Sequence, residues 1–185
     1  MEHRLTKGEK TRLAILRTAS VSFRDRGYDV ATLEEIGAQL GLTRSAVLHH
    51  FGGKSDILQE IVSPYLHSLE ALLDRAEREG PAGTRERRRF LTDLVELMSD
   101  HRFAVSLLSR DITSRAKLEN HHLADVTARC VRILAPRRDE AAKIRALAAF
   151  GAITRPLTTD QHDIELRDPE SRRVLVDCAV AVLRH

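Results

Sequence analysis

Apolar residues recur at spacings of three and four along almost the whole chain, which is the periodicity of amphipathic α-helices. The first apolar stripe consists of Ile15, Leu16, Ala19 and Phe23. It predicts a helix over residues 7–26, which Gly27 ends. Neither the alternation typical of half-buried β-strands nor an internal repeat is evident. The pattern therefore predicts an all-α protein of about nine helices.

Two short helices are predicted next, and the residues at their ends define them. Thr32 and Glu35 have the spacing of a capping box, which predicts the start of a helix that ends at Gly41. Thr43 is the predicted N-cap of a following helix that runs to about His50. Two short helices joined by a glycine-containing turn are typical of a helix-turn-helix. Its small core is expected to contain Leu33, Ile36, Leu40, Leu42 and Val47.

A long helix is predicted from about residue 54 to 79, and its length suits a connection between two domains. Further helices are predicted at roughly 85–99, 102–110, 119–134, 139–154 and 169–184. The last begins at Asp168-Pro169, an N-cap followed by proline at the first helical position. We therefore expect a helix-turn-helix domain over residues 1–54 and a second, helical domain over residues 55–185, to which the family resemblance described below assigns ligand binding and dimerisation.

Composition and charge narrow the class of protein. Apolar residues make up 42% and charged residues 31% of the chain, which is ordinary for a soluble globular protein. No apolar run reaches the roughly 18 residues that a membrane span needs, and no secretory signal is seen, so no membrane association is expected. Two cysteines, Cys130 and Cys178, fit a reducing cytoplasm. A cytoplasmic protein is predicted.

The net charge of +3 is unevenly placed along the chain. Residues 1–54 carry nine Lys and Arg against six Asp and Glu, whereas residues 55–185 carry 21 of each. All of the excess positive charge therefore coincides with the predicted helix-turn-helix. An excess of this sign favours contact with a polyanion such as DNA.

Residues 15–58 resemble the DNA-binding domain of the TetR (tetracycline-repressor-like) family of regulators. The resemblance rests on Ile15-Leu16, Ala19, Phe23, Gly27-Tyr28, Thr32, Ile36, Gly41-Leu42-Thr43, Ala46, His49-His50-Phe51 and Lys54 to Leu58. The family often has Gly where Ser45 stands and usually Tyr, commonly a phosphate contact, where Leu48 stands. The resemblance implies a ligand-responsive transcriptional regulator, expected to be a repressor, that binds double-stranded operator DNA as a homodimer and responds to a small-molecule effector.

The third predicted helix is the expected recognition helix, and it presents Thr43, Arg44, Ser45 and Ala46 at its N-terminal end. Arg44 can donate two hydrogen bonds to guanine O6 and N7, a contact that discriminates against other bases by roughly 1–3 kcal/mol. Ala46 can pack on a thymine methyl group. Thr32 and Lys54 begin flanking helices, where a phosphate is favoured. His49 and His50 can reach a phosphate or a base, or only cap the end of the helix.

The predicted C-terminal helix is apolar nearly all round, because nine of the ten residues 174–183 are apolar. Such a helix must be covered on more than one side. We predict a two-fold, four-helix dimer interface that it forms with the 139–154 helix, and a buried helix in a monomer is the alternative. The predicted interface residues are Ala148, Gly151, Ala152, Leu175, Cys178, Ala179 and Val182.

The resemblance also implies an effector pocket between the middle helices. Ordinary core residues would show the same helical spacing as residues that line such a pocket. The candidate lining residues are Leu94, Met98, Phe103, Leu107, Val126 and Cys130. A metal set made of His101, His121, His122 and Asp125 is an alternative, but surface histidines explain these positions more simply. We therefore predict no metal and no other cofactor.

An enzyme is not predicted, because we find no nucleophile–base pair, no metal motif of reliable spacing and no phosphate loop. Gly52-Gly53-Lys54-Ser55 lacks the earlier glycine that a P-loop needs, since residue 48 is Leu. The alternative to a regulator is a helical interaction protein or small-molecule carrier that keeps a vestigial helix-turn-helix.

Overall fold

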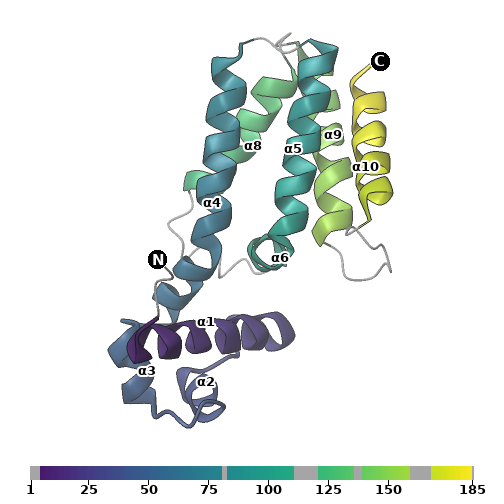
Figure 1. Ribbon diagram of the computed structural model, residues 1–185. Coiled ribbons are helices and arrows are strands. Elements are labelled where there is room, and N and C mark those ends of the chain that lie inside the picture. The colour runs from purple at the N-terminus through teal and green to yellow at the C-terminus, as the bar shows by residue number, and fades with distance from the viewer. Residues whose placement is uncertain (1–4, 81–82, 111–120, 136–138, 159–167, 185) are drawn as a thin grey trace. The chain divides into compact units, whose positions relative to one another are not determined.

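The structure is a computed structural model that describes residues 5–80, 83–110, 121–135, 139–158 and 168–184 (Figure 1). This part of the chain contains nine α-helices and no strand, so the all-α prediction is confirmed. The helices are α1 (Lys7–Arg26), α2 (Leu33–Ala38), α3 (Arg44–His50), α4 (Lys54–Arg78), α5 (Thr84–Asp100), α6 (Arg102–Arg110), α8 (His121–Leu134), α9 (Glu140–Thr158) and α10 (Pro169–Leu183).

Side-chain caps set the starts of the helices that carry the helix-turn-helix. The hydroxyl oxygen of Thr32 accepts from the Glu35 N–H at 3.2 Å, and the Glu35 carboxylate accepts from the Thr32 N–H at 3.1 Å. This reciprocal pair is the predicted capping box. At the start of α3, Thr43 accepts from the Ala46 N–H at 3.2 Å. Asp168 caps α10 in the same way, through the Ser171 N–H at 3.0 Å.

Two predicted helix ends were placed wrongly. α2 ends at Ala38 instead of Gly41, because residues 39–41 form a turn. Gly41 lies at the end of this turn with a φ of 68°. α9 runs on to Thr158 instead of ending near residue 154. Pro156 lies inside α9 and Pro64 inside α4. Each proline lacks the N–H that would bond to the carbonyl four residues earlier, yet the helix continues past it.

The described residues form two compact units, which we treat separately. The N-terminal unit comprises those within Met1–Pro64 and Leu107–Glu119, and the C-terminal unit those within Tyr65–Ser106 and Asn120–His185. Among the described residues, the units are divided inside α4, after Pro64, and inside α6, between Ser106 and Leu107. None of the described helices combines the length and the apolar character that a membrane span requires.

The core of the N-terminal unit gathers one apolar face from each of its helices. Phe23 of α1 meets Tyr28 edge to face, with ring centroids 5.1 Å apart. α1 also supplies Ile15, which is fully buried. The helix-turn-helix contributes Ile36 of α2 and Val47 of α3, both fully buried as expected. Leu40 and Leu42, which were expected in the same core, are only half-buried because they lie in the turn.

The C-terminal unit is a helical bundle in which α10 packs on α9 and α5, and α8 packs on α9 (Figure 1). Its buried side chains come from every one of these helices, as residues at helical spacing predict. They include Leu91, Leu94, Val95, Cys130, Leu134, Ala146, Ala149, Ile153, Val176, Ala179 and Val180. Small residues on α9 and α10 allow these two helices to pack closely.

Gly37 fixes the crossing of α2 and α3. Its carbonyl oxygen accepts the N–H groups of both Leu40 and Leu42, each at 2.9 Å, so the turn folds back onto the end of α2. A Cβ at this position would lie 2.7 Å from the Leu42 carbonyl oxygen and 3.1 Å from a methyl group of Val47. The helix-turn-helix therefore has room only for a hydrogen atom at residue 37.

We expect Gly37→Ala to lower the free energy of unfolding by about 1–3 kcal/mol, because the backbone carbonyl of Leu42 cannot move aside without breaking the turn. Chemical denaturation followed by circular dichroism measures the change. Gly8→Ala is the matched control, since Gly8 lies in α1 with nothing near its added Cβ. That control should be neutral or stabilising by up to about 1 kcal/mol. Equal stability of both variants and the parent would contradict the steric argument.

Candidate nucleic-acid interface

The predicted recognition helix α3 presents its polar residues outward. Val47 is its buried anchor, whereas Arg44, Ser45 and His49 are exposed. Ala46 and His50 are half-buried. One side of the helix therefore holds it to the unit, and the N-terminal side chains on the other side remain accessible to a ligand.

Arg44, the predicted base-reading residue, pairs with a residue that the sequence analysis did not single out. Its Nε lies 2.9 Å from Oε1 of Glu34 on α2, and both side chains are about 60% exposed. An exposed ion pair of this kind stabilises a fold by about 1 kcal/mol at most. The pair therefore orients Arg44 more than it stabilises the unit.

Thr32 lies where a phosphate contact was predicted, but its oxygen already caps α2. The partner in the capping box, Glu35, also pairs with Arg26, whose Nη1 lies 2.7 Å from the carboxylate. The Arg26 guanidinium, followed by the Thr32 N–H, lowers the pKa of Glu35. Thr32 keeps its hydroxyl hydrogen as a donor for an outside acceptor. Its role at a phosphate stays a prediction.

The C-terminal end of α3 is held by an arginine from α1. The Arg12 guanidinium donates to the backbone carbonyl of His50 and to the carboxylate of Glu60 on α4. It also lies 4.0 Å from the ring centroid of Phe51, a cation–π contact. Arg12 thus joins three helices at the point where α3 ends, and the carbonyl of His50, which has no partner inside α3, gains a donor.

Lys54, the other predicted phosphate contact, turns its side chain into the unit. Its Nζ lies 2.6, 3.1 and 2.8 Å from the carbonyl oxygens of Tyr28, Asp29 and Ala31. It also lies 4.5 Å from the centre of the Tyr28 ring. These carbonyls engage the three donors of the ammonium group, which leaves it poorly placed for a phosphate. The phosphate contact was predicted only because Lys54 begins a helix. The sequence does not show that the three carbonyl groups lie within reach of its side chain.

The residues that the sequence analysis missed have weak signals in the sequence. Arg12 and Glu34 lie on predicted helices among many other charged residues, and nothing in their spacing marks their partners. Gly37 has a clearer signal, because a glycine inside a helix lowers helix stability and so requires a reason. Close approach of a second backbone is such a reason, and the Leu42 carbonyl provides it.

The predicted effector residues lie in the interior of the protein. Leu94, Met98, Leu107, Val126 and Cys130 are buried, and Phe103 is half-buried. Burial raises the pKa of the Cys130 thiol to about 12, so the thiol stays protonated and unreactive at neutral pH. These residues are placed as core residues, and their role in lining an effector site stays a prediction.

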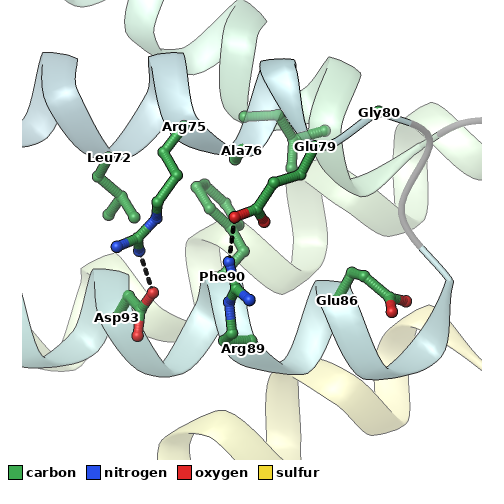
Figure 2. Close-up of a pocket in the computed structure, with 10 residues that line it drawn as sticks. Leu72, Arg75, Ala76, Glu79, Gly80, Glu86, Arg89, Phe90 and Asp93 are labelled. Atoms are coloured by element: carbon green, nitrogen blue, oxygen red, sulfur yellow. Dashed lines mark hydrogen bonds and ion pairs between the residues drawn. The ribbon is translucent and has the colours of Figure 1, made fainter.

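A pocket between α4 and α5 lies elsewhere and includes none of those six residues (Figure 2). Leu72, Phe90 and Ile133 provide its apolar lining. Two ion pairs cross it, with Arg75 of α4 meeting Asp93 of α5 and Glu79 meeting Arg89 of α5 (Figure 2). These four charged groups pair with one another across the pocket, and the carboxylate of Glu86 also lines it (Figure 2).

The metal alternative gains no support from the described residues. Among them, no three His, Cys, Asp or Glu side chains gather where they could hold a metal ion. The side chains of His121 and His122 lie outside the described part of the structure.

The predicted dimer residues differ in exposure. Ala148 and Cys178 are exposed, and Gly151, Ala152, Leu175 and Val182 are half-buried. Ala179 is fully buried within its own unit, so it cannot contact a partner in this packing. Large exposed apolar residues of α9 and α10 that were not among the predicted interface residues are Ile144, Leu147 and Val174.

Comparison with known proteins locates the same module. A family model described as "Bacterial regulatory proteins, tetR family" matches residues 15–61, which include α2, α3 and the start of α4. Over these residues, about a quarter of the chain, the sequence is similar to the TetR family of bacterial regulators. This agrees with the resemblance seen in the sequence, which was placed over nearly the same residues.

Two curated TetR-type relatives each match this chain over fewer than 80 residues. The "HTH-type transcriptional repressor BepR" of Brucella suis biovar 1 (strain 1330) is 40% identical over 77 residues, which are 40% of this chain and 37% of the relative. The "HTH-type transcriptional regulator SrpR" of Pseudomonas putida is 39% identical over 64 residues, 35% of this chain and 30% of the relative. The match thus spans about a third of the length of these relatives.

Solved TetR-family structures share the fold over nearly the whole chain. PfmR from Thermus thermophilus has a TM-score of 0.69 at 23% identity, over 92% of this chain and 97% of that one. A family member from Streptomyces coelicolor also has a TM-score of 0.69, at 24% identity, over 91% of this chain and 88% of that one. At these identities the likeness establishes the TetR fold.

We expect Lys54→Met to lower the free energy of unfolding by about 1–3 kcal/mol, because three carbonyls lose a shared charged donor. Thermal and denaturant unfolding followed by circular dichroism measures the loss. Lys10→Met, which removes an exposed lysine from α1, is the matched control and should change stability by less than about 0.5 kcal/mol. If the two variants were equally stable, the ammonium of Lys54 would not be a structural element of this unit.

Proposed function

We propose that this chain is a ligand-responsive transcriptional repressor of the TetR family, which binds a pseudo-palindromic operator as a homodimer. The observation that carries the proposal is the outward face of α3. Arg44 and Ser45 are exposed at the N-terminal end of a helix that Val47, Arg12 and Gly37 hold in place. A recognition helix reads base edges in the major groove with side chains at this end.

Within this proposal, base reading and positioning are separate tasks. Arg44 contacts guanine, and Ser45 and Ala46 contact neighbouring base edges or a thymine methyl group. Thr32, Thr43, His49 and His50 position the helix on the phosphate backbone. Lys54 acts through its helix start and its charge, since its side-chain donors are engaged within the unit.

The dimer is supported by the apolar surface that one chain leaves uncovered. Ile144 is 58% and Leu147 50% exposed on α9, and Val174 is 52% exposed on the neighbouring α10. Ile144, Leu147, Ala148 and Gly151 recur at spacings of three and four, so they form one stripe along α9. A two-fold pairing of these helices covers the stripe and presents two copies of α3 to two half-sites.

The proposed effector site and the proposed direction of regulation each rest on a separate observation. The buried residues Leu94 and Met98 of α5 and Val126 and Cys130 of α8 would line the effector site if the core opens on binding. Effector and operator would then oppose each other with equal coupling in both directions. Repression is proposed because the relative from Brucella suis is named a repressor. A DNA-binding regulator with this role works in the cytoplasm.

The competing proposal is a helical carrier or interaction protein with a vestigial helix-turn-helix. Selection of bound sequences from a random duplex pool separates the two. A regulator enriches a half-site repeated at a spacing of about one or two helical turns, and its binding weakens steeply as salt concentration rises. Recovery of unselected sequences would favour the carrier.

We expect Arg44→Ala to abolish the preference at one base pair in each half-site, because the bidentate contact with guanine is lost. The expected loss of discrimination there is about 5- to 150-fold, equivalent to roughly 1–3 kcal/mol. Competition binding with duplexes altered at single base pairs measures it. Arg17→Ala removes the same charge from the exposed side of α1 and should leave the preference unchanged. Unchanged preference in both variants would show that Arg44 does not read a base.

We expect Ile144→Glu to convert the dimer into monomers at micromolar concentration, because a carboxylate would have to be buried in an apolar interface. Sedimentation velocity on the purified full chain measures the change. Val21→Glu is the matched control, since Val21 is an exposed valine on α1 of the other unit. A parent chain that sediments as a monomer, or a variant that remains dimeric, would refute the α9 interface.

A further inference from the structure

We propose that Glu34 is a specificity-determining positioning residue. It orients the guanidinium of Arg44 for contact with a guanine, and its negative charge weakens binding to DNA that has no guanine at that position. The proposal rests on the proposed function, in which α3 reads an operator. It starts from the ion pair between Glu34 Oε1 and Arg44 Nε, which are 2.9 Å apart. The pair joins the first turn of α2 to the first residue of α3.

The choice of nitrogen matters for what Arg44 can do. Arginine recognises guanine bidentately, through two donors that point in parallel toward O6 and N7. Because Glu34 contacts the inner Nε, the two terminal nitrogens of Arg44 can still donate together to a base. A carboxylate on a terminal nitrogen would instead compete with the guanine for the same donors.

The location of Arg44 gives Glu34 a second role. Arg44 is the first residue of α3, at the positive end of the helix dipole, and the first turn of α3 contains no acidic residue. A cation is disfavoured at this end of a helix. Glu34 supplies the missing negative charge from α2, across the turn that Gly37 keeps tight. It therefore favours the side-chain orientation in which Arg44 stays close to α2.

The same carboxylate also discourages binding to arbitrary DNA. Glu34 is 59% exposed beside the proposed reading residue, so its charge faces any duplex that approaches α3. Non-specific binding depends on attraction to phosphates, and a negative charge on the contact face weakens it. At the correct site, the bidentate contact of Arg44 offsets this repulsion. Glu34 thus lowers binding to random DNA more than binding to the operator.

The test uses the full chain, the half-site obtained by selection, and four variants: Glu34→Gln, Glu34→Ala, Arg44→Ala and the double variant Glu34→Gln/Arg44→Ala. Competition binding measures each protein on the operator, on duplexes altered at each base pair, and on random duplex. Asp25→Asn is the matched control, because the Arg24 Nε and Asp25 Oδ1 atoms form a similarly exposed pair, 2.8 Å apart, on α1. Thermal unfolding checks that every variant is folded.

We expect Glu34→Gln and Glu34→Ala to reduce discrimination at the base pair read by Arg44 by about two- to fivefold, the range that an exposed ion pair supports. Affinity for random duplex should rise by a similar factor. In the Arg44→Ala background, Glu34→Gln should cause no further loss of discrimination at that pair, because Glu34 acts through Arg44. Asp25→Asn should leave discrimination unchanged.

Two results would overturn the inference while leaving the proposed function intact. One is a parent that selects a half-site together with Glu34 variants that discriminate as the parent does. The other is a Glu34→Gln effect that persists in the Arg44→Ala background, which would mean that Glu34 contacts a base by itself. A parent that selects no sequence would instead refute the proposed function, and the present inference with it.

Discussion

The helix-turn-helix depends on the contact between the ammonium group of Lys54 and three backbone carbonyl groups. These are the carbonyls of Tyr28, Asp29 and Ala31, the last residues before the N-cap of α2. Six- and seven-residue helices are far too short to be stable alone, so their positions must be imposed from outside. Lys54 holds the start of α2. Gly37 then fixes α3 against α2, because the missing side chain lets the Leu42 carbonyl and the Val47 methyl group of α3 approach its backbone.

Arg12 completes the restraint from the other side. It binds the carbonyl at the end of α3 and the Glu60 carboxylate of α4, so α3 is fixed at both of its ends. Arg12 satisfies a carbonyl that the short helix α3 cannot satisfy itself, and Lys54 satisfies three carbonyls of the segment that precedes α2. The N-terminal unit therefore holds α3, the proposed recognition helix, with polar contacts as well as with its small apolar core.

Local features of the fold were predictable from the sequence, and contacts between distant residues were not. Helix positions follow from apolar periodicity and from caps such as Thr32, Thr43 and Asp168, because these signals act within about four residues. The partners of Lys54 lie more than twenty residues away in the chain, and Glu34 lies ten from Arg44. The rotation of a helix about its axis is equally non-local. Ala179 was placed in the dimer interface, yet packing turns it inward and leaves Val174 outside.

The contacts of the cations change what the charge of this unit means for DNA binding. The excess of Lys and Arg over residues 1–54 is small, and two of its members, Arg12 and Lys54, have donors engaged within the unit. Their charges still add to the long-range field, but their hydrogen atoms are not available to phosphates. If the unit binds DNA as proposed, its bulk attraction to the backbone is modest, and the choice among sequences falls to contacts that form only at the right base. In that proposal Arg44 is suited to such a contact, since the carboxylate of Glu34 lies at its Nε, offsets part of its attraction for phosphates and leaves its terminal donors unoccupied.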